Sequence, residues 1–485
     1  MNFSLMRTLK YLLLFILLFN ISCKKTENSK VQSNKKEITF FDIKKQDGSQ
    51  FNTGEINISF SGDSIKVLIP FGVNRNMLIP VITFNGKQII PASGVAQNFT
   101  NPITYTVYAE DGSTRSYVVS VQNEAQAIQN KTVYFGDEDG NFYALDALTG
   151  IQIWRHTFPS ASNLTYGAPA YYDGNIFTAS SNGGDIFCLN ALNGNLVWQY
   201  HASNTGIESS PTVMNGVVYF GTNDDEIIAL DANNGNLIWR YMTGGNVSTG
   251  PIISNGNLYI GSSDTRVYSL DISSGQQIWN SPMSGLINQS GPVFSNSNLY
   301  VGSRYGYLTS VNSNNGSINW RFSTDTISLE MSSPTVANGI VYIAGWYNFF
   351  DFSIKGSVYA VNASNGQLIW ESLQNTGFSC SPIVENNLLF IVGDDSKLYA
   401  LNATTGSIVW QVSHILHNGS SPCVANGIVY MGSGGSHYFL AFDAQTGNQI
   451  WQYNVPTSSK FSPPLVVFKG TQTELYYSTV SGMKQ

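Results

Sequence analysis

Residues with side chains suited to chemistry are few and scattered along this sequence. Three aspartate pairs stand in predicted turns: Asp137 and Asp139, Asp224 and Asp225, and Asp394 and Asp395. Paired carboxylates can act on glycosides or bind Ca²⁺. Aspartate is also common in β-turns, because its side chain accepts hydrogen bonds from turn amides. We favour the turn role, and glycoside or Ca²⁺ chemistry is the alternative.

Histidine and cysteine give no stronger signal. His414 and His417 have a spacing that could place both near a metal, but a third ligand is not evident, so we predict no metal site. Cys188, Cys380 and Cys423 are isolated, and no C-x-x-C-H haem motif occurs. Cys380 and Cys423 are predicted to point to opposite faces of adjacent strands, so we expect no disulfide between them. The sequence predicts no catalytic residue.

The elements that carry these residues follow from an internal repeat. Its clearest copy runs from Ala229 to Trp239, A-L-D-A-N-N-G-N-L-I-W. The pattern predicts two antiparallel strands and a tight turn, in which the Asx side chain bonds turn amides and Gly takes a positive φ. Eight copies end at a tryptophan: Trp154, Trp198, Trp239, Trp279, Trp320, Trp370, Trp410 and Trp451.

A repeat period near forty residues predicts four short strands per copy. In the third copy they begin at Ser210, Val217, Glu226 and Asn236. Such units bury their faces only against neighbouring units, and a β-propeller provides those neighbours while leaving few open edges. We therefore predict an all-β protein with an eight-bladed propeller over residues 131–485, in which the tryptophans are wedges between blades.

The repeat resembles the pyrroloquinoline-quinone (PQQ)-like propeller repeat, A-x-D-x-x-T-G-x-x-x-W. Thr precedes the Gly at Thr149, Thr405 and Thr446, and other copies have Asn or Ser. Eight such repeats on a lipoprotein resemble the propeller subunit of the outer-membrane β-barrel assembly machine. Quinoprotein dehydrogenases share these blades, but that resemblance also implies vicinal cysteines, a charged cofactor pocket and a Ca²⁺ site. We predict no cofactor.

The N-terminus predicts a lipid anchor. Arg7 and Lys10 precede an apolar run, and Ser22 stands before Cys23, so residues 1–22 look like a lipoprotein signal with lipid attachment at Cys23. The alternative is a plain secretory signal. Lys24 and Lys25 favour the outer membrane under the usual sorting rule, with either the periplasmic or the exterior face possible. Residues 23–36 are polar and predict a flexible tether.

Residues 37–122 alternate in β-strand fashion and predict a small immunoglobulin-like β-sandwich. Glu110-Asp111-Gly112-Ser113 is a hairpin signal. The stretch from Asn98 to Thr114 resembles immunoglobulin-like modules that follow the anchor in Gram-negative surface lipoproteins, which implies a spacer, with direct glycan binding as an alternative. Residues 123–130 predict a linker.

One propeller face is expected to carry the function. A proline recurs in the loops between copies, at Pro169, Pro211, Pro251, Pro292, Pro334, Pro382, Pro422 and Pro463. The residues three positions earlier should ring the central channel: Tyr166, Glu208, Ser248, Gln289, Met331, Ser379, Gly419 and Lys460. Their variety favours a ligand site, and a solvated rim is the alternative. Glu208 and Glu330 are the only acids near this mouth and lie three blades apart, so we expect no acid and base pair.

The sixth copy carries an insertion between Gly345 and Gly356. Five aromatics stand in it, at Trp346, Tyr347, Phe349, Phe350 and Phe352. In an exposed loop they would form an apolar patch suited to a protein, sugar or lipid. Alternatively, the loop folds back and plugs the channel or covers a blade.

The two ends of the propeller should meet. The first copy lacks its innermost strand, and Ser462 to Val467 resembles the missing piece, so we expect a C-terminal strand to close the ring. Glu474 to Thr479 has no assigned place.

Net charge −7 and the lack of a basic patch exclude nucleic acid as a partner. The predicted function is a non-catalytic binding scaffold, held to a membrane of the cell envelope by its lipid and contacting an envelope protein. The alternatives are a glycan-binding lipoprotein for polysaccharide uptake and a PQQ-dependent oxidoreductase.

Overall fold

The structure is a computed structural model. It describes residues 33–45, 48–51, 56–69, 73, 75–123, 131–158, 162–348, 350–351, 353, 356–413, 420–434, 437–455, 460–469 and 474–478. Several predicted features lie outside these residues: the signal, Cys23, most of the tether and linker, Phe349, Phe352, His414, His417 and Gly419. The chain divides into two compact units, Met1–Ala125 and Gln126–Gln485. Within the described residues, no helix is long and apolar enough to cross a membrane.

The N-terminal unit is a β domain of two sheets around one apolar core that includes Phe41, Val67, Tyr105 and Val119. The hairpin predicted around Asp111 and Gly112 joins two paired strands, β6 and β7. The strands are β1 (Glu37–Lys44), β2 (Asn57–Ser61), β3 (Ser64–Ile69), β4 (Ile79–Asn85), β5 (Gln88–Ile90), β6 (Ile103–Tyr108) and β7 (Thr114–Asn123).

The alternating pattern predicts strands over residues 56–60, 64–69, 78–84, 103–109 and 116–121, so two strands of this unit and one pairing were not predicted. β1 pairs with β4 in a separate sheet, and β5 is a three-residue edge strand. β1 escapes a period-2 pattern because its register shifts between Ile38 and Phe40, which interrupts the alternation. β3 pairs with β7 in parallel. This pairing was not predicted because the two strands are far apart in sequence and no turn joins them.

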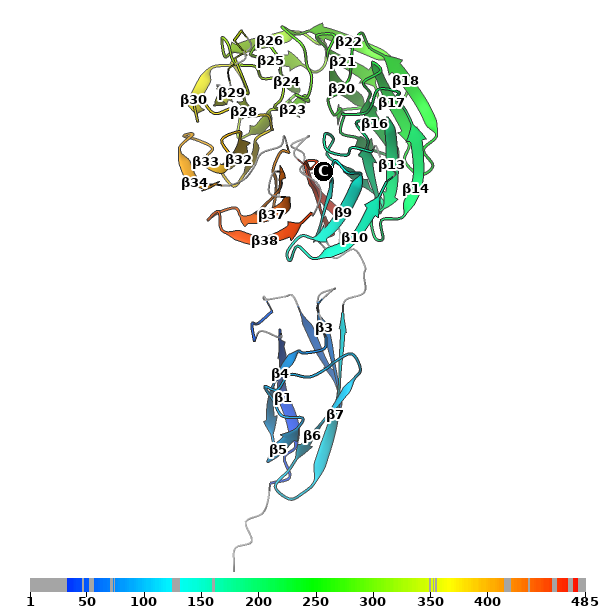
Figure 1. The fold of residues 1–485 in the computed structure, drawn as a ribbon, viewed down its shortest axis with the longest axis vertical. Helices are drawn as coiled ribbons and strands as arrows, with labels where there is room; N and C mark the ends of the chain where they lie inside the picture. Colours follow the sequence, from blue (N-terminus) through cyan, green and yellow to red (C-terminus); the bar gives the residue numbers. More distant parts are fainter. Residues whose placement is uncertain are drawn as a thin grey trace, which may run out of the picture. The chain divides into compact units, whose positions relative to one another are not determined.

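The second unit contains eight sheets among the described residues, seven with four strands and one with five. Figure 1 shows them following one another around a ring in sequence order. We number them one to eight along the chain. The first holds β8 (Lys131–Gly136), β9 (Asn141–Asp146), β10 (Gln152–Thr157), β39 (Leu465–Lys469) and β40 (Glu474–Ser478).

The other seven sheets are antiparallel and pair their strands in sequence order. The second to fourth comprise β11 (Ala170–Tyr172), β12 (Asn175–Ala179), β13 (Asp185–Asn190), β14 (Leu196–His201); β15 (Thr212–Met214), β16 (Val217–Gly221), β17 (Glu226–Asp231), β18 (Leu237–Met242); and β19 (Ile252–Ser254), β20 (Asn257–Ser262), β21 (Arg266–Asp271), β22 (Gln277–Pro282). The fifth and sixth comprise β23 (Val293–Ser295), β24 (Asn298–Gly302), β25 (Tyr307–Asn312), β26 (Ile318–Ser323); and β27 (Thr335–Ala337), β28 (Ile340–Ala344), β29 (Val358–Asn362), β30 (Leu368–Ser372). The seventh and eighth comprise β31 (Ile383–Glu385), β32 (Leu388–Gly393), β33 (Lys397–Asn402), β34 (Ile408–Ser413); and β35 (Cys423–Ala425), β36 (Ile428–Ser433), β37 (Tyr438–Asp443), β38 (Gln449–Asn454).

The repeat motif joins each sheet to the next. Asp231 accepts hydrogen bonds from the amides of Asn233 and Asn234, and Gly235 has φ 72°. A Cβ on Gly235 would lie 2.8 Å from Cε3 of Trp198, a ring of the preceding sheet. The glycine is therefore required twice, by backbone conformation and by the indole packed against it. The same contact recurs at Gly150, Gly194, Gly275, Gly316, Gly366, Gly406 and Gly447.

Each tryptophan also donates its indole N–H to a main-chain carbonyl of the next sheet. Because a buried indole N–H needs an acceptor, this bond fixes the ring orientation. The acceptors, in order from Trp154, are Ala191, Ala232, Ile272, Ser313, Ala363, Ala403, Ala444 and, from Trp451, Ala147. The tryptophans thus lie between sheets, as predicted.

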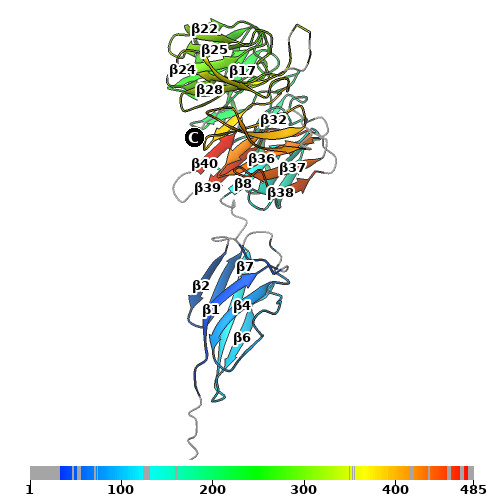
Figure 2. The ribbon, with the colours of Figure 1, turned by 90° about the vertical axis from the view of Figure 1, so that its left-hand side faces the viewer.

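The C-terminal strand completes the first sheet. β39 pairs antiparallel with β8, which confirms the expected closure, and Figure 2 shows both beside each other. β40, which the sequence left unplaced, pairs with the other edge of β39. It therefore extends the first sheet one strand beyond the position that β39 fills.

Candidate functional site

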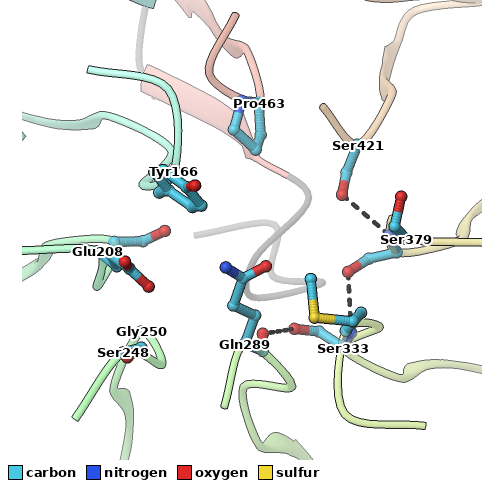
Figure 3. A pocket seen from close by; sticks show the side chains of 12 residues that line it. Tyr166, Glu208, Ser248, Gly250, Gln289, Ser333, Ser379, Ser421 and Pro463 are labelled. Carbon is cyan, nitrogen blue, oxygen red and sulfur yellow. Dashed lines mark hydrogen bonds between the residues drawn. The ribbon is translucent and has the colours of Figure 1, made fainter. Parts of the chain in front are cut away.

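A pocket opens where the loops between sheets converge. Six of its lining residues stand three positions before the recurrent prolines: Tyr166, Glu208, Ser248, Gln289, Met331 and Ser379. The structure thus brings together side chains that are spread over more than two hundred residues of sequence. Figure 3 shows Tyr166, Glu208 and Gln289 pointing into one common space.

Two predicted mouth residues are placed elsewhere. Lys460 is exposed but does not line this pocket. Glu330 does not line it either, because its side chain is buried behind the wall, with 4% of its surface exposed. Glu330, predicted to be near the mouth, thus adjoins the lining residue Met331 in sequence, but its side chain is not part of the lining.

Serines that precede the prolines hold the pocket wall in place. The Ser381 hydroxyl accepts a hydrogen bond from the backbone N–H of Ser333 at 2.9 Å. The Ser421 hydroxyl accepts one from the backbone N–H of Ser381, also at 2.9 Å. Ser210 and Ser333 accept amides of the preceding loop in the same way. These bonds connect neighbouring sheets, so the inter-sheet loops form a continuous rim. These serines were not predicted from the sequence, although the Ser-Pro dipeptide recurs in these loops.

Glu208 is the one carboxylate that lines the pocket among the described residues. Burial raises the pKa of Glu208, and hydrogen bonds from the Asn223 and Gln289 side chains oppose that rise. Asn223 is held in turn by the Ser248 hydroxyl, which donates to its Oδ1 at 3.3 Å. The carboxylate is thus positioned by neutral amides.

Glu330 belongs to a second polar cluster behind the pocket wall. The Tyr347 hydroxyl donates to its Oε1 at 3.0 Å, and Asn288 donates to its Oε2 at 2.6 Å. The Arg304 guanidinium lies 3.8 Å from Oε1. Burial raises the pKa of Glu330, and the Tyr347 hydrogen bond and Arg304 charge oppose that rise. Asn288 and Arg304 had no sequence signal, because no motif relates them to Glu330.

The aromatic insertion is only partly the exposed patch that the sequence predicted. Tyr347 is buried, at 7% exposure, because its hydroxyl reaches Glu330. Trp346 is half-buried and donates its indole N–H to Asp394 Oδ2 at 2.9 Å. Phe350 is 72% exposed. The expected exposure is therefore wrong for Tyr347 and correct for Phe350.

One member of each predicted aspartate pair accepts hydrogen bonds at a turn. Asp137 is fully buried and accepts from the Tyr143 hydroxyl at 3.1 Å and from the Asn141 amide at 2.8 Å. Asp224 accepts the amide of Asn204 at 2.7 Å. Asp394 accepts from Trp346. Asp137 thus stabilises its own turn, whereas Asp224 and Asp394 connect their turns to loops of the neighbouring sheets.

The chemistry of the pocket does not fit PQQ. That cofactor carries three carboxylates, whereas the described lining has one carboxylate and neither lysine nor arginine. The cavity volume is about 50 Å³, far below the ~300–1,000 Å³ typical of small-molecule sites. Cys188, Cys380 and Cys423 are buried and form no disulfide with one another. Among the described residues, no group of three or more potential ligands could hold a metal.

The fold and its repeated Asx-Gly-Trp motif define a PQQ-like β-propeller with an N-terminal β domain. A family model described as Outer membrane protein assembly factor BamB matches residues 138–345, 283–375 and 354–478, and the chain belongs to this family. A second model, described as SGBP, N-terminal, matches residues 38–121.

Individual proteins match more distantly. Tetrathionate hydrolase of Acidithiobacillus ferrooxidans is 27% identical over 172 residues, 30% of this chain and 34% of that protein. Polyvinylalcohol dehydrogenase of a Pseudomonas species is 28% identical over 137 residues, 25% of this chain and 21% of that protein. The chain therefore spans about a third or less of the length of these relatives.

Two solved structures share the fold. BamB from Moraxella catarrhalis superposes with a TM-score of 0.53 at 16% identity, over 66% of this chain and 97% of that one. Quinohemoprotein alcohol dehydrogenase from Comamonas testosteroni gives 0.51 at 13% identity, over 73% and 74%. At these identities the likeness concerns the fold alone.

Proposed function

We propose that this chain is a lipid-anchored protein of the cell envelope that binds another protein through the pocket face and catalyses no reaction. In this proposal the eight sheets are the blades of one closed propeller. One observation carries it: equivalent positions in six successive loops supply side chains of five different types to one pocket. A surface that recognises a partner needs such variety, whereas a repeat that only closes a ring does not.

The anchor and the N-terminal domain complete the proposal. Lipid on Cys23 would hold the chain at the outer membrane, and the tether would separate the folded part from the bilayer. The N-terminal unit then acts as an immunoglobulin-like spacer. Palmitate labelling of wild type and Cys23→Ala, followed by membrane fractionation, tests this part; an unlabelled wild-type chain would contradict the anchor.

The wall of the pocket supports binding without catalysis. General acid and base catalysis most often uses a histidine, or carboxyl groups whose pKa values differ. In the described lining Glu208 stands among serines, one amide side chain and one tyrosine. The second nearby acid, Glu330, is enclosed by Tyr347 and Asn288.

Capture from a detergent extract of the envelope tests the proposal. Wild type should retain a defined envelope protein, and Glu208→Gln with Gln289→Ala should lose it, whereas Glu371→Gln on an exposed strand should keep it. Equal recovery with all three chains would refute a role for the pocket face. Addition of PQQ and Ca²⁺ tests the catalytic alternative, because a stoichiometric absorbance band would contradict the non-catalytic assignment.

The match of residues 38–121 to the SGBP N-terminal model favours a second candidate, glycan binding in polysaccharide uptake. The exposed ring of Phe350 suits stacking on a sugar. Retardation on affinity gels that contain polysaccharides tests it. Retardation that Phe350→Ser abolishes would favour the glycan, and uniform mobility together with protein capture would favour the scaffold.

A further inference from the structure

The pocket has an unusual balance of charge. Glu208 contributes a carboxylate that is partly withdrawn from water, and its hydrogen-bond donors are the neutral side chains of Asn223 and Gln289. No lysine or arginine lines the described pocket. Withdrawal of a carboxylate from water without a cation is costly, so the site is electrostatically incomplete.

Glu330, which is buried, differs from Glu208 in its charged neighbours. Glu330 has the Arg304 guanidinium 3.8 Å from Oε1, in addition to its bonds from Tyr347 and Asn288. The chain thus supplies a cation to the acid that is closed off behind the wall. At the acid that faces the pocket, the described residues supply none.

The atoms around Glu208 are suited to accept hydrogen bonds. In Figure 3 the amide nitrogen of Gln289 is turned toward the side of Glu208, and its oxygen faces the middle of the pocket. The Tyr166 hydroxyl and the Glu208 carboxylate point into the same space. A carboxylate, an amide oxygen and a hydroxyl together match the three N–H donors of a primary ammonium group.

We propose that this pocket binds the ammonium group of a lysine side chain from the partner protein. The group supplies the missing charge and three donors, and its narrow aliphatic stem fits a cavity of about 50 Å³. A sugar ring or an aromatic ligand would need a larger space. The net charge of −7 favours the approach of a basic partner. The inference rests on the proposed protein-binding function and names the chemistry of the contact.

Ligand-observed NMR titration of the full-length chain in detergent micelles tests the pocket directly. The probes are Nα-acetyl-lysine methylamide and Nα-acetyl-norleucine methylamide, which differ in the ammonium group, with empty micelles as the blank. We expect saturable binding of the lysine probe and at least about tenfold weaker binding of the norleucine probe. Equal affinity for both probes overturns the proposal.

Two matched variants assign the effect to Glu208. Glu208→Gln keeps the size and removes the charge, and should weaken lysine binding at least about tenfold. Glu371→Gln removes an equal charge from an exposed strand and should leave binding within about twofold. If both variants weaken lysine binding equally, net charge alone explains the effect and the proposal is overturned. If Glu208→Gln fails to fold by its tryptophan emission, the comparison of the two probes on wild type decides.

The outcomes separate this inference from the proposed function. Capture of an envelope protein that survives Glu208→Gln, without lysine-probe binding, overturns the lysine pocket and leaves protein binding in place. Probe binding that depends on Glu208, without any captured protein, supports the lysine pocket and counts against the proposed function.

Discussion

The indole N–H of Trp451 donates to the carbonyl oxygen of Ala147 at 3.0 Å, although the two residues are 304 positions apart. Seven other tryptophans make the same bond to the sheet that follows them in sequence. Trp451 instead reaches back to the first sheet. The contact that elsewhere joins consecutive repeats therefore also joins the last repeat to the first.

The closing bond should contribute measurably to stability. Trp451→Phe keeps most of the apolar ring but leaves the Ala147 carbonyl without its indole donor, so we expect a loss of about 1–3 kcal/mol. Guanidinium unfolding followed by far-UV circular dichroism measures it. Trp320→Phe, at a half-buried indole within the ring, is the comparison; an unchanged midpoint for Trp451→Phe would show that the closing bond adds nothing.

The repeat glycines should be sensitive for two separable reasons. Gly235→Ala places a Cβ 2.8 Å from the Trp198 ring at φ 72°, whereas Gly256→Ala meets open space at φ 77°. Each variant should lose about 1–2 kcal/mol of stability, because alanine is strained at a positive φ. Only Gly235→Ala should also displace an indole ring. Thermal unfolding should therefore rank Gly235→Ala as clearly less stable. Equal losses would mean that the indole moves aside freely.

The buried thiols should be inert while the propeller is folded. Burial raises the pKa of the Cys188 thiol to about 12, and burial also raises the pKa of Cys423. Since the thiolate is the reactive form, a disulfide reagent at pH 8 should label neither residue until guanidinium unfolds the chain. Mass mapping of labelled peptides checks this, and rapid labelling of the native protein would contradict the burial.

Glu330 should give the protein a pH-dependent stability term. Burial raises its folded pKa above the unfolded value of about 4.3, so the folded state binds the proton more tightly. This contribution is fully present below pH ~4 and is lost as pH rises through the folded pKa. Denaturation midpoints from pH 4 to 7 should therefore fall more steeply for wild type than for Glu330→Gln. Parallel curves would contradict the shift, and Glu371→Gln is the control at an exposed site.

Two aromatic residues of the insertion should differ in how much they contribute to stability. Tyr347→Phe removes the donor to buried Glu330 and should cost about 1–3 kcal/mol. Phe350→Ser changes a ring that is 72% exposed, and should alter stability by less than about 0.5 kcal/mol. Thermal unfolding measures both. A large loss from Phe350→Ser would show that its ring packs against the fold.

Local sequence signals predicted the sheets well because their strands are joined by short turns. In the third sheet the predicted second and third strands, Val217–Gly221 and Glu226–Asp231, match β16 and β17 residue for residue. The β1 strand was missed because its register shift hides the alternation. β40 was seen as a strand but had no partner, since no short turn ties it to the first sheet.

The candidate site was only half predictable. The position three before each proline identified the six pocket residues, because equivalent positions of a repeat occupy equivalent places around a ring. The same spacing did not predict that Glu330 accepts hydrogen bonds from Tyr347 and Asn288. The partner of a buried acid depends on loops from different sheets, whose lengths and conformations the repeat does not specify.

The sequence by itself determined the repeat, the order of strands within the seven four-stranded sheets, and the glycine and tryptophan of every junction. These features depend on contacts within one turn or between equivalent positions of neighbouring copies. Tertiary structure decided which side chains from distant copies meet. Gln289 donates to Glu208, and Trp346 to Asp394, only because the packing of successive sheets fixes their loops in space. Such contacts follow from three-dimensional proximity, which linear spacing does not encode.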